Sequence, residues 1–242
     1  MAGTGFCLFA GAAQSDEISV IATPAVRESY LELVPQFEKA TGHRVVTQWV
    51  GTTDLMKRVA AGENADLVIV GAKSMDELIH LGRIVPGSRV DLVKSGIGVA
   101  VRAGAPKPDI SSGQKLKQTL LSAKTIGVSS GPSGVYLDGL FQRMGIAEQL
   151  KPKLVQPPSG ASIGQLIARG DAEIGFQQIS ELLHVAGTDY LGPLPPDVQL
   201  ITVFASGIHV NAANPLVAKV LASFLVSPAA IPVIRKYGME PG

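Results

Sequence analysis

Short apolar runs rich in β-branched residues alternate with longer amphipathic segments from residue 18 almost to the end of the chain. This alternation is typical of an α/β fold, in which helices cover a largely parallel sheet. With 46% apolar residues, the 242-residue chain can bury a core of that kind. We expect strands at Ile18–Ala22, Arg44–Val50, Asp66–Gly71, Gly96–Arg102, Thr125–Ser129, Lys153–Gln156, Glu173–Gln177 and Gln199–Ala205.

Two of the apolar runs are punctuated by glycine and flank the middle third of the chain. They are Ser95–Gly104 (SGIGVAVRAG) and Val203–Asn211 (VFASGIHVN). Paired crossings of this type suit a hinge between two lobes, because glycine absorbs the backbone change that closure requires. We therefore predict one lobe from 17–94 together with 205–242, and a second lobe from 95–204. The alternative is a single sheet in which both runs are ordinary central strands.

The first residues, MAGTGFCLFAGAAQS, are small and apolar and precede the polar pair Asp16-Glu17. They resemble the second half of a secretory signal, but the positively charged start is missing. We expect 1–16 to be a truncated signal or a disordered tail, and the protein to be periplasmic in the first case and cytoplasmic in the second. Phe6 stands where a lipoprotein signal needs a small residue before Cys7, so no lipid anchor is expected.

The charge balance excludes several classes of function. Lys and Arg number 21 against 20 Asp and Glu, which gives a net charge of +1 and no basic field for a nucleic acid. Cys7 has no second cysteine to pair with, and the four histidines are scattered without ligand spacing. We expect no metal site, no cofactor and no nucleic-acid partner, and we expect the chain to be a monomer.

Small uncharged loops with hydroxyl groups follow several expected strands, each at the start of a helix. In α/β sheets such loops gather at the carboxyl ends of the strands, where ligands bind. Free N–H groups at a helix start attract anions, and a nearby Ser or Thr adds a donor. The alternative is that each Ser or Thr in these loops merely caps its helix. The loops are Ala22–Ala25, Gly51–Thr53, Ser130–Gly134 and Ser159–Ser162, and Gln177 and Gln178 end a further strand.

Five segments of the chain, in this order and spacing, resemble the periplasmic molybdate-binding proteins of ABC transporters. They are ISVIATPAVRESYLELVPQFEKATG, GTTDLMKRVAAGENADLVIVGA, PSGVYLDGLFQRMG, LIARGDAEIGFQQISEL and SPAAIPVIRKYG, and they extend over 17–238. The resemblance implies a two-lobed, type II solute-binding fold that closes around a small oxyanion. It also implies an ABC permease in the membrane as the partner of an exported chain.

In that family neutral donors hold the oxyanion: hydroxyl groups of the first two loops, backbone N–H groups of the next two, and a tyrosine hydroxyl. Two positions depart from the pattern, since Ala25 stands in place of a serine and Gln178 in place of the tyrosine. These departures leave the identity of the anion open, because backbone donors need no particular side chain. The resemblance implies ligand contacts at Thr23, Pro24, Ala25, Thr52, Thr53, Ser133, Gly160, Ala161 and Gln178.

Two enzyme hypotheses stand beside this binding role, for which we expect no catalytic residue. Gly127–Gly131 matches the G-x-S-x-G pattern of a serine hydrolase, with Ser129 as nucleophile and Asp189 and His209 in triad order. The match is weak, because His209 falls in an expected hinge strand.

The second enzyme hypothesis is an isomerase or lyase that acts on a small carboxylate and is built on the solute-binding fold. Arg27, beside the first loop, could anchor the carboxylate. The alternative is that Arg27 is an exposed helix residue of the usual kind. Trp49 is interpreted as part of a lobe core.

Overall fold

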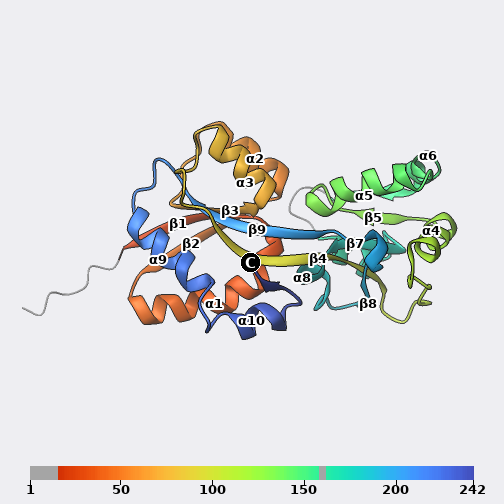
Figure 1. Ribbon diagram of the computed structural model, residues 1–242. Helices are drawn as coiled ribbons and strands as arrows, with labels where there is room; N and C mark the ends of the chain where they lie inside the picture. The colour runs from red at the N-terminus through yellow and green to blue at the C-terminus, as the bar shows by residue number, and fades with distance from the viewer. Residues whose placement is uncertain (1–15, 158–161) are drawn as a thin grey trace, which may run out of the picture.

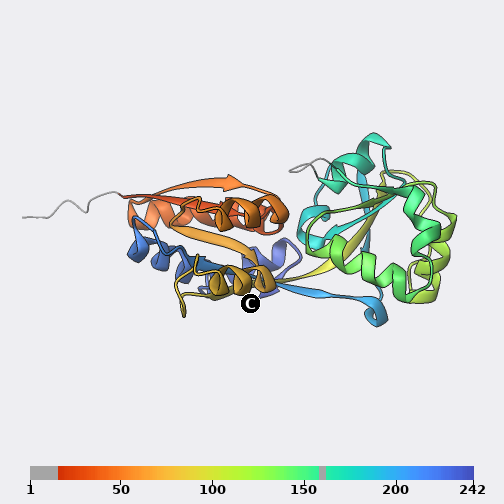
Figure 2. The same ribbon diagram turned by 90° about the horizontal axis from the view of Figure 1, so that it is seen from above.

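The computed structural model describes residues 16–157 and 162–242, which form two α/β lobes joined by two crossing strands (Figures 1 and 2). The predicted two-lobe α/β architecture is confirmed. Gly160, Ala161 and all but the last residue of the expected signal or tail lie outside the described residues. Within the described part of the chain, no helix is both long and apolar enough to cross a membrane.

The first lobe has a mixed sheet with helices on both faces (Figure 1). Three of its strands are parallel: β2 (Arg44–Trp49), β1 (Glu17–Ala22) and β3 (Leu67–Gly71). Strand β9 (Ile201–Ile208) pairs antiparallel with β3, the first part of β4 (Val90–Arg102) pairs antiparallel with β9, and the short β10 (Glu240–Pro241) pairs antiparallel with β4. One face carries α1 (Arg27–Thr41), α9 (Pro215–Leu225) and α10 (Ile231–Lys236), and the other carries α2 (Thr52–Ala60) and α3 (Ala72–His80). All five residues of β3 are buried because both faces are covered.

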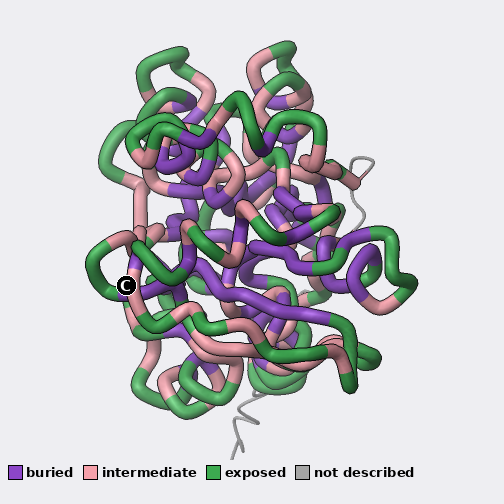
Figure 3. The backbone as a smooth tube through the Cα atoms, turned by 90° about the vertical axis from the view of Figure 1, so that its right-hand side faces the viewer, coloured by how far each residue is buried: buried purple, intermediate pink, exposed green. Residues whose placement is uncertain are grey.

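The second lobe repeats this plan on a smaller scale. Its parallel strands are β7 (Ile174–Gln178), β5 (Ile126–Val128) and β6 (Leu154–Val155), and β8 (Thr188–Pro193) pairs with the far half of β4. Its helices are α4 (Gly113–Ser122), α5 (Pro132–Arg143), α6 (Ala147–Leu150), α7 (Ile163–Arg169) and α8 (Ile179–Leu182). The second lobe also has two short 3-10 helices, η2 (Lys151–Lys153) and η3 (Pro196–Val198), and the first lobe has one, η1 (Pro24–Val26). Buried strands run through the middle and exposed helical turns surround them (Figure 3).

Strand β4 passes from one lobe to the other and changes its partners on the way. Up to Gly96 it pairs with β9, and from Ile97 onward with β7 and β8. The side chain of Gln199 fastens the crossing, since its amide exchanges hydrogen bonds of 2.9 and 3.0 Å with the backbone of Ile97. A Cβ on Gly98 would lie 2.8 Å from Cε2 of Tyr190, so close packing requires glycine there. We propose that the lobes divide as predicted, into 17–94 with 205–242 and 95–204.

The expected strands are present with ends that differ by a few residues, and β4 begins earlier than predicted, at Val90. The strands β8 and β10 were not predicted. The alternative that the loop hydroxyl groups cap their helices is wrong for Thr53 and Ser133, because Gly51 and Gly131 occupy the cap positions and neither helix has a side-chain cap bond. It is confirmed for Ser162, whose hydroxyl accepts from the N–H of Gly164 at the start of α7. The hydroxyl groups at the starts of α2 and α5 are therefore not used as caps.

Candidate functional site: a polar cleft between the lobes

A cleft of about 330 Å³ lies between the lobes and is lined by residues of both. Six of the expected site residues are in its described lining: Thr23, Pro24, Ala25, Thr52, Ser133 and Gln178. Thr53 is not in the lining, and Gly160 and Ala161 lie outside the described residues. The described parts of the expected loops therefore converge at the strand ends, while residues 159–161 of the fourth loop lie outside the described residues. That these residues contact a ligand stays a prediction.

The first-lobe side of the cleft presents two threonine hydroxyl groups. Thr23 follows β1 and is held by a 3.0 Å bond from its N–H to the carbonyl of Ile69 in β3. Its Oγ1 lies 3.3 Å from Oγ1 of Thr52, the first residue of α2. The first intrahelical bond of α2 runs from Leu55 N–H to Gly51, so the N–H of Thr52 is not used inside the helix. This side thus offers neutral donors at a helix start.

The second-lobe side presents the start of α5 and two serines. Oγ of Ser129 and Oγ of Ser133 lie 2.8 Å apart, and the N–H of Gly131 donates to Ser129 at 3.3 Å. A Cβ on Gly134 would overlap the carbonyl oxygen of Ser129, so only glycine lets the helix begin this close to the loop. Burial and these bonds fix Ser133, which is 1% exposed, at the cleft wall.

Contacts between the lobes close both flanks of the cleft. On one flank, the hydroxyl of Thr53 donates to the carbonyl of Ser130 at 3.4 Å, which places Thr53 beside the cleft rather than in its lining. On the other flank, the hydroxyl of Ser180 donates to the carbonyl of Ala25 at 2.6 Å. Ala25 thus takes part in the site through its backbone, although it lacks the serine hydroxyl that the family pattern has.

Gln178 lines the cleft, but its amide already has partners on the crossing strands. It is 1% exposed, and the Oγ1 of Thr202 in β9 lies 3.3 Å from one end of the amide. The carbonyl oxygens of Ser95 and Gly96 in β4 lie 3.2 Å from the other end, which is where the amide nitrogen can donate. Gln178 therefore ties the second lobe to both crossing strands.

Ionisable side chains also line the cleft, and of these only Arg27 was expected from the sequence to contact a ligand. The described lining includes Arg27 and Glu28 of α1, Glu181 of α8 and His184 just beyond it. Glu181 accepts a 2.7 Å bond from Nε2 of Gln177, and burial raises the pKa of its carboxyl from 4.5 to about 8. The sequence does show Gln177 and Glu181 four residues apart at the end of a strand, but this spacing does not reveal that the carboxyl of Glu181 is buried.

Arg27 is half-exposed at the mouth of the cleft. Its guanidinium carbon lies 6.0 Å from the ring centre of Trp49, and Nη1 lies 4.0 Å from a carboxylate oxygen of Glu28. Trp49 itself packs against the first-lobe core and edge-on to Tyr30, with ring centroids 5.2 Å apart, and is not in the cleft lining. The interpretation of Trp49 as a core residue agrees with this packing.

The serine-hydrolase hypothesis is wrong. Ser129 shares its hydroxyl with Ser133, whereas His209 is buried in the first lobe with its Nδ1 accepting from the N–H of Asn211. Asp189 lies on β8 and pairs with Lys107 at 3.3 Å. The three side chains are in different parts of the molecule because the elements that carry them belong to different sheets or sheet edges.

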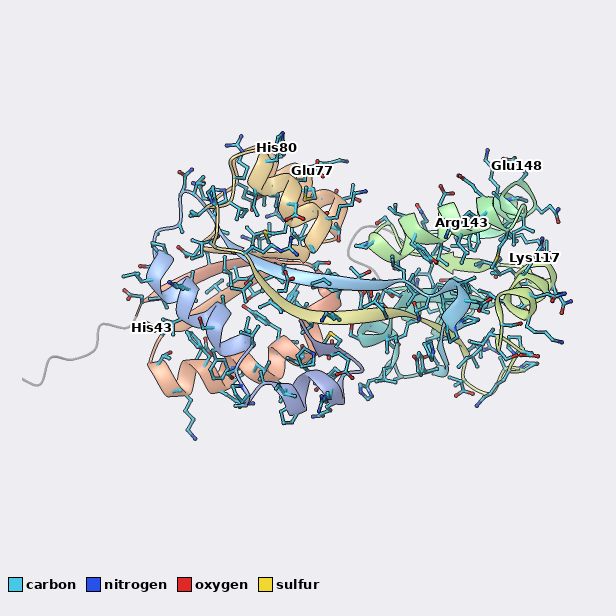
Figure 4. All side chains as sticks on the ribbon, in the orientation of Figure 1. His43, Glu77, His80, Lys117, Arg143 and Glu148 are labelled. Carbon is cyan, nitrogen blue, oxygen red and sulfur yellow. The ribbon has the colours of Figure 1, made fainter. Side chains whose placement is uncertain are left out.

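The charged and histidine side chains labelled in Figure 4 lie toward the outer parts of the two lobes, away from where the lobes meet. They are His43, Glu77 and His80 on the first lobe and Lys117, Arg143 and Glu148 on the second. Among described residues, no three His, Cys, Asp or Glu side chains come together as a metal site.

Comparisons with known proteins agree with this architecture. A model of bacterial extracellular solute-binding proteins matches residues 18–240. An aconitate isomerase from a Pseudomonas species is 36% identical over 93% of this chain and 87% of its own length, and the molybdate-binding protein ModA of Escherichia coli is 26% identical over 95% and 91%. The solved periplasmic molybdate-binding protein of Azotobacter vinelandii matches with a TM-score of 0.79 at 21% identity, over 93% of this chain and 99% of that one. The predicted resemblance and the type II two-lobe fold are confirmed.

Proposed function

The chain belongs to the family of bacterial extracellular solute-binding proteins, and from this premise we propose that it captures a small oxyanion between its lobes for an ABC transporter. The observation that supports this most is the meeting of hydroxyl groups from both lobes, Thr23 and Thr52 against Ser129 and Ser133, in one cleft. The proposal includes a periplasmic location, a monomeric chain and a membrane permease as partner.

The chemistry of the hydroxyl donors favours a fully deprotonated anion. A hydroxyl or N–H group that donates to the anion is matched best by a fully deprotonated oxygen, whereas a hydrogen on the anion would take up one of these hydroxyl groups as an acceptor. Molybdate or tungstate should therefore bind more tightly than phosphate, which is largely protonated at neutral pH. Two relatives are named for molybdate, which supports an anion of this type.

A thermal-shift screen tests this proposal. We expect molybdate, tungstate or sulfate to raise the melting temperature, because a ligand at a hundred times its Kd stabilises the folded state by about 2.7 kcal/mol. Phosphate serves as the comparison anion of similar shape. If none of the tetrahedral anions binds below millimolar concentration, oxyanion transport is not the function.

A second candidate function is the isomerisation of a small carboxylate. Two observations favour it: Arg27 and the protonatable Glu181 line the same cleft, and the relative at 36% identity is named an aconitate isomerase. Arginine binds carboxylates through paired hydrogen bonds, so Arg27 could hold a carboxylate substrate. An oxyanion site made of neutral donors does not need such a cation. Chemical change of a bound polycarboxylate separates this candidate from transport.

A further inference from the structure

Hydrogen bonds from the neighbouring residues Gln177 and Gln178 hold the carboxyl of Glu181 in place at the cleft. Gln177 donates Nε2 to Oε1 of Glu181 at 2.7 Å, while Oε1 of Gln177 accepts from the N–H of Ile163 at 3.0 Å. Because Ile163 occupies the oxygen end of the amide, the nitrogen end must point at Glu181. The N–H of Gln178 also donates to the carboxyl. The carboxyl is therefore fixed in position and still lines the cleft.

The other ionisable groups that face the cleft are placed differently. Glu28 is 45% exposed and lies beside Arg27, so water and a cation are available to it. His184 is exposed, and its ring lies against the first lobe, with Nε2 3.3 Å from the carbonyl of Lys236. The strands β4 and β8, which also pack against α8, contribute no charged side chain to the described lining, and Gln165 of α7 is neutral. Among described residues, Glu181 forms no ion pair.

From this arrangement we propose that Glu181 is a catalytic residue that removes and returns a proton in the allylic isomerisation of a small unsaturated polycarboxylate bound in the cleft. This proposal rests on the second candidate function above. It adds the reaction class and the residue that carries it.

The acidity of Glu181 suits that task. An acid–base group works best when its pKa lies near the working pH, and burial raises the pKa of Glu181 to about 8. An ordinary carboxylate with a pKa near 4.5 is a much weaker base toward a C–H bond. At neutral pH a useful fraction of Glu181 is ionised, and this ionised fraction has no cation bound to it that would lower its basicity.

The proposed step balances without a cofactor. The Glu181 carboxylate takes a proton from the methylene carbon next to the substrate's double bond, and the electrons of that C–H bond delocalise into the double bond and the adjoining carboxylate. Glu181, now protonated, exchanges its acid proton with water in part of the turnovers and delivers a proton to the far carbon of the former double bond. The double bond moves by one position and Glu181 returns to its starting state. Arg27 and the N–H groups at the helix starts can stabilise the negative charge that develops.

Proton exchange with solvent is a direct test. The full chain is incubated in D₂O with cis-aconitate or trans-aconitate, and NMR follows deuterium entry at carbon and the appearance of the other isomer. We expect exchange and isomerisation by the wild type, and a loss of at least about a hundredfold in Glu181→Gln, since acid–base groups contribute 10²–10⁴-fold. The wild-type rate should rise with pH and level off above about 8.

Two controls keep the outcomes separate. Glu181→Gln keeps the shape and neutral charge of the protonated carboxyl, so it should fold and should bind the polycarboxylate within a few-fold of the wild type in calorimetry. Glu77→Gln is the matched change on the outer surface of the first lobe and should leave exchange unaltered (Figure 4). If wild type exchanges and Glu181→Gln exchanges equally fast, the role of Glu181 is overturned and the isomerase function stands. If the wild type neither binds nor exchanges any polycarboxylate, both are overturned.

Discussion

The two kinds of surface in the cleft differ in what they can do to a ligand. The hydroxyl surface, made by Thr23 and Thr52 facing Ser129 and Ser133, is neutral and can donate hydrogen bonds at any pH. The ionisable surface, made by Glu181 with Arg27, Glu28 and His184 around it, can also exchange protons or pair with carboxylates. A cleft with the first surface alone suits capture and release. The presence of the second surface allows chemistry in the same cleft.

The largest effect should follow from a change that removes the hydroxyl surface. In Gly134→Ala the new Cβ would overlap the carbonyl oxygen of Ser129, so α5 or the Ser129 loop must move. We expect the free energy of unfolding to fall by about 3 kcal/mol, as for severe overpacking, and oxyanion binding to be lost. Chemical denaturation and calorimetry measure both.

Gly139→Ala is the matched control in the same helix. A Cβ there would meet only the flexible end of Arg143, 3.3 Å away, and alanine favours a helix by about 0.5–1 kcal/mol over glycine. If Gly134→Ala proves as stable and as active in binding as Gly139→Ala, the close approach of α5 to Ser129 does not shape the cleft.

A smaller effect should follow from removal of one hydroxyl donor. Thr52→Ala deletes a hydrogen bond to a charged ligand, which should weaken oxyanion binding by about 1.5–3 kcal/mol, or roughly ten- to a hundredfold in Kd. The neighbouring Thr53→Ala removes a hydroxyl that bonds Ser130 beside the cleft, and it should change Kd much less. Titration calorimetry with molybdate or tungstate compares the two. Equal losses would show that the hydroxyl of Thr52 has no special place in the site.

The hydroxyl surface could be predicted from the sequence, whereas most of the ionisable surface could not. Thr52 and Ser133 follow strands at a spacing that brings them to one edge of a parallel sheet, and this local pattern is readable. The position of Glu181 depends on how α8 packs against β4 and the first lobe, and the sequence does not specify that packing. The same limit affects Gln178, whose amide was expected at the ligand and is bonded to the crossing strands.

The fold shows the same division between local and distant information. Alternation of apolar residues predicted the longer strands and the two lobes. The short edge strand β10 forms only because Glu240 and Pro241 meet Lys94 and Val93, more than half the chain away, and nothing local to them indicates a strand.

The last comparison concerns the ionisable surface and the pH dependence of stability. Since the pKa of Glu181 is about 8 in the folded state and its ordinary value is 4.5, the folded chain keeps a proton that the unfolded chain loses between these values. Stability from this group therefore falls as pH rises from about 4.5 to 8 and is constant above. Glutamine cannot lose a proton, so the melting temperature of Glu181→Gln should rise relative to that of the wild type as the pH increases from 5 to 8. A difference between the two that is independent of pH would contradict the raised pKa.

A crystal structure of the chain with its tightest-binding oxyanion shows directly whether the cleft between the lobes is the binding site. We expect the anion to lie between the lobes, within hydrogen-bond distance of the Thr52 hydroxyl on one side and of the N–H of Ser133 on the other. Tungstate is the preferred probe because its electron density is unmistakable. An anion bound on the outer face of either lobe, or a cleft that stays free of tungstate at concentrations that saturate the protein in calorimetry, would show that the cleft is not the oxyanion site.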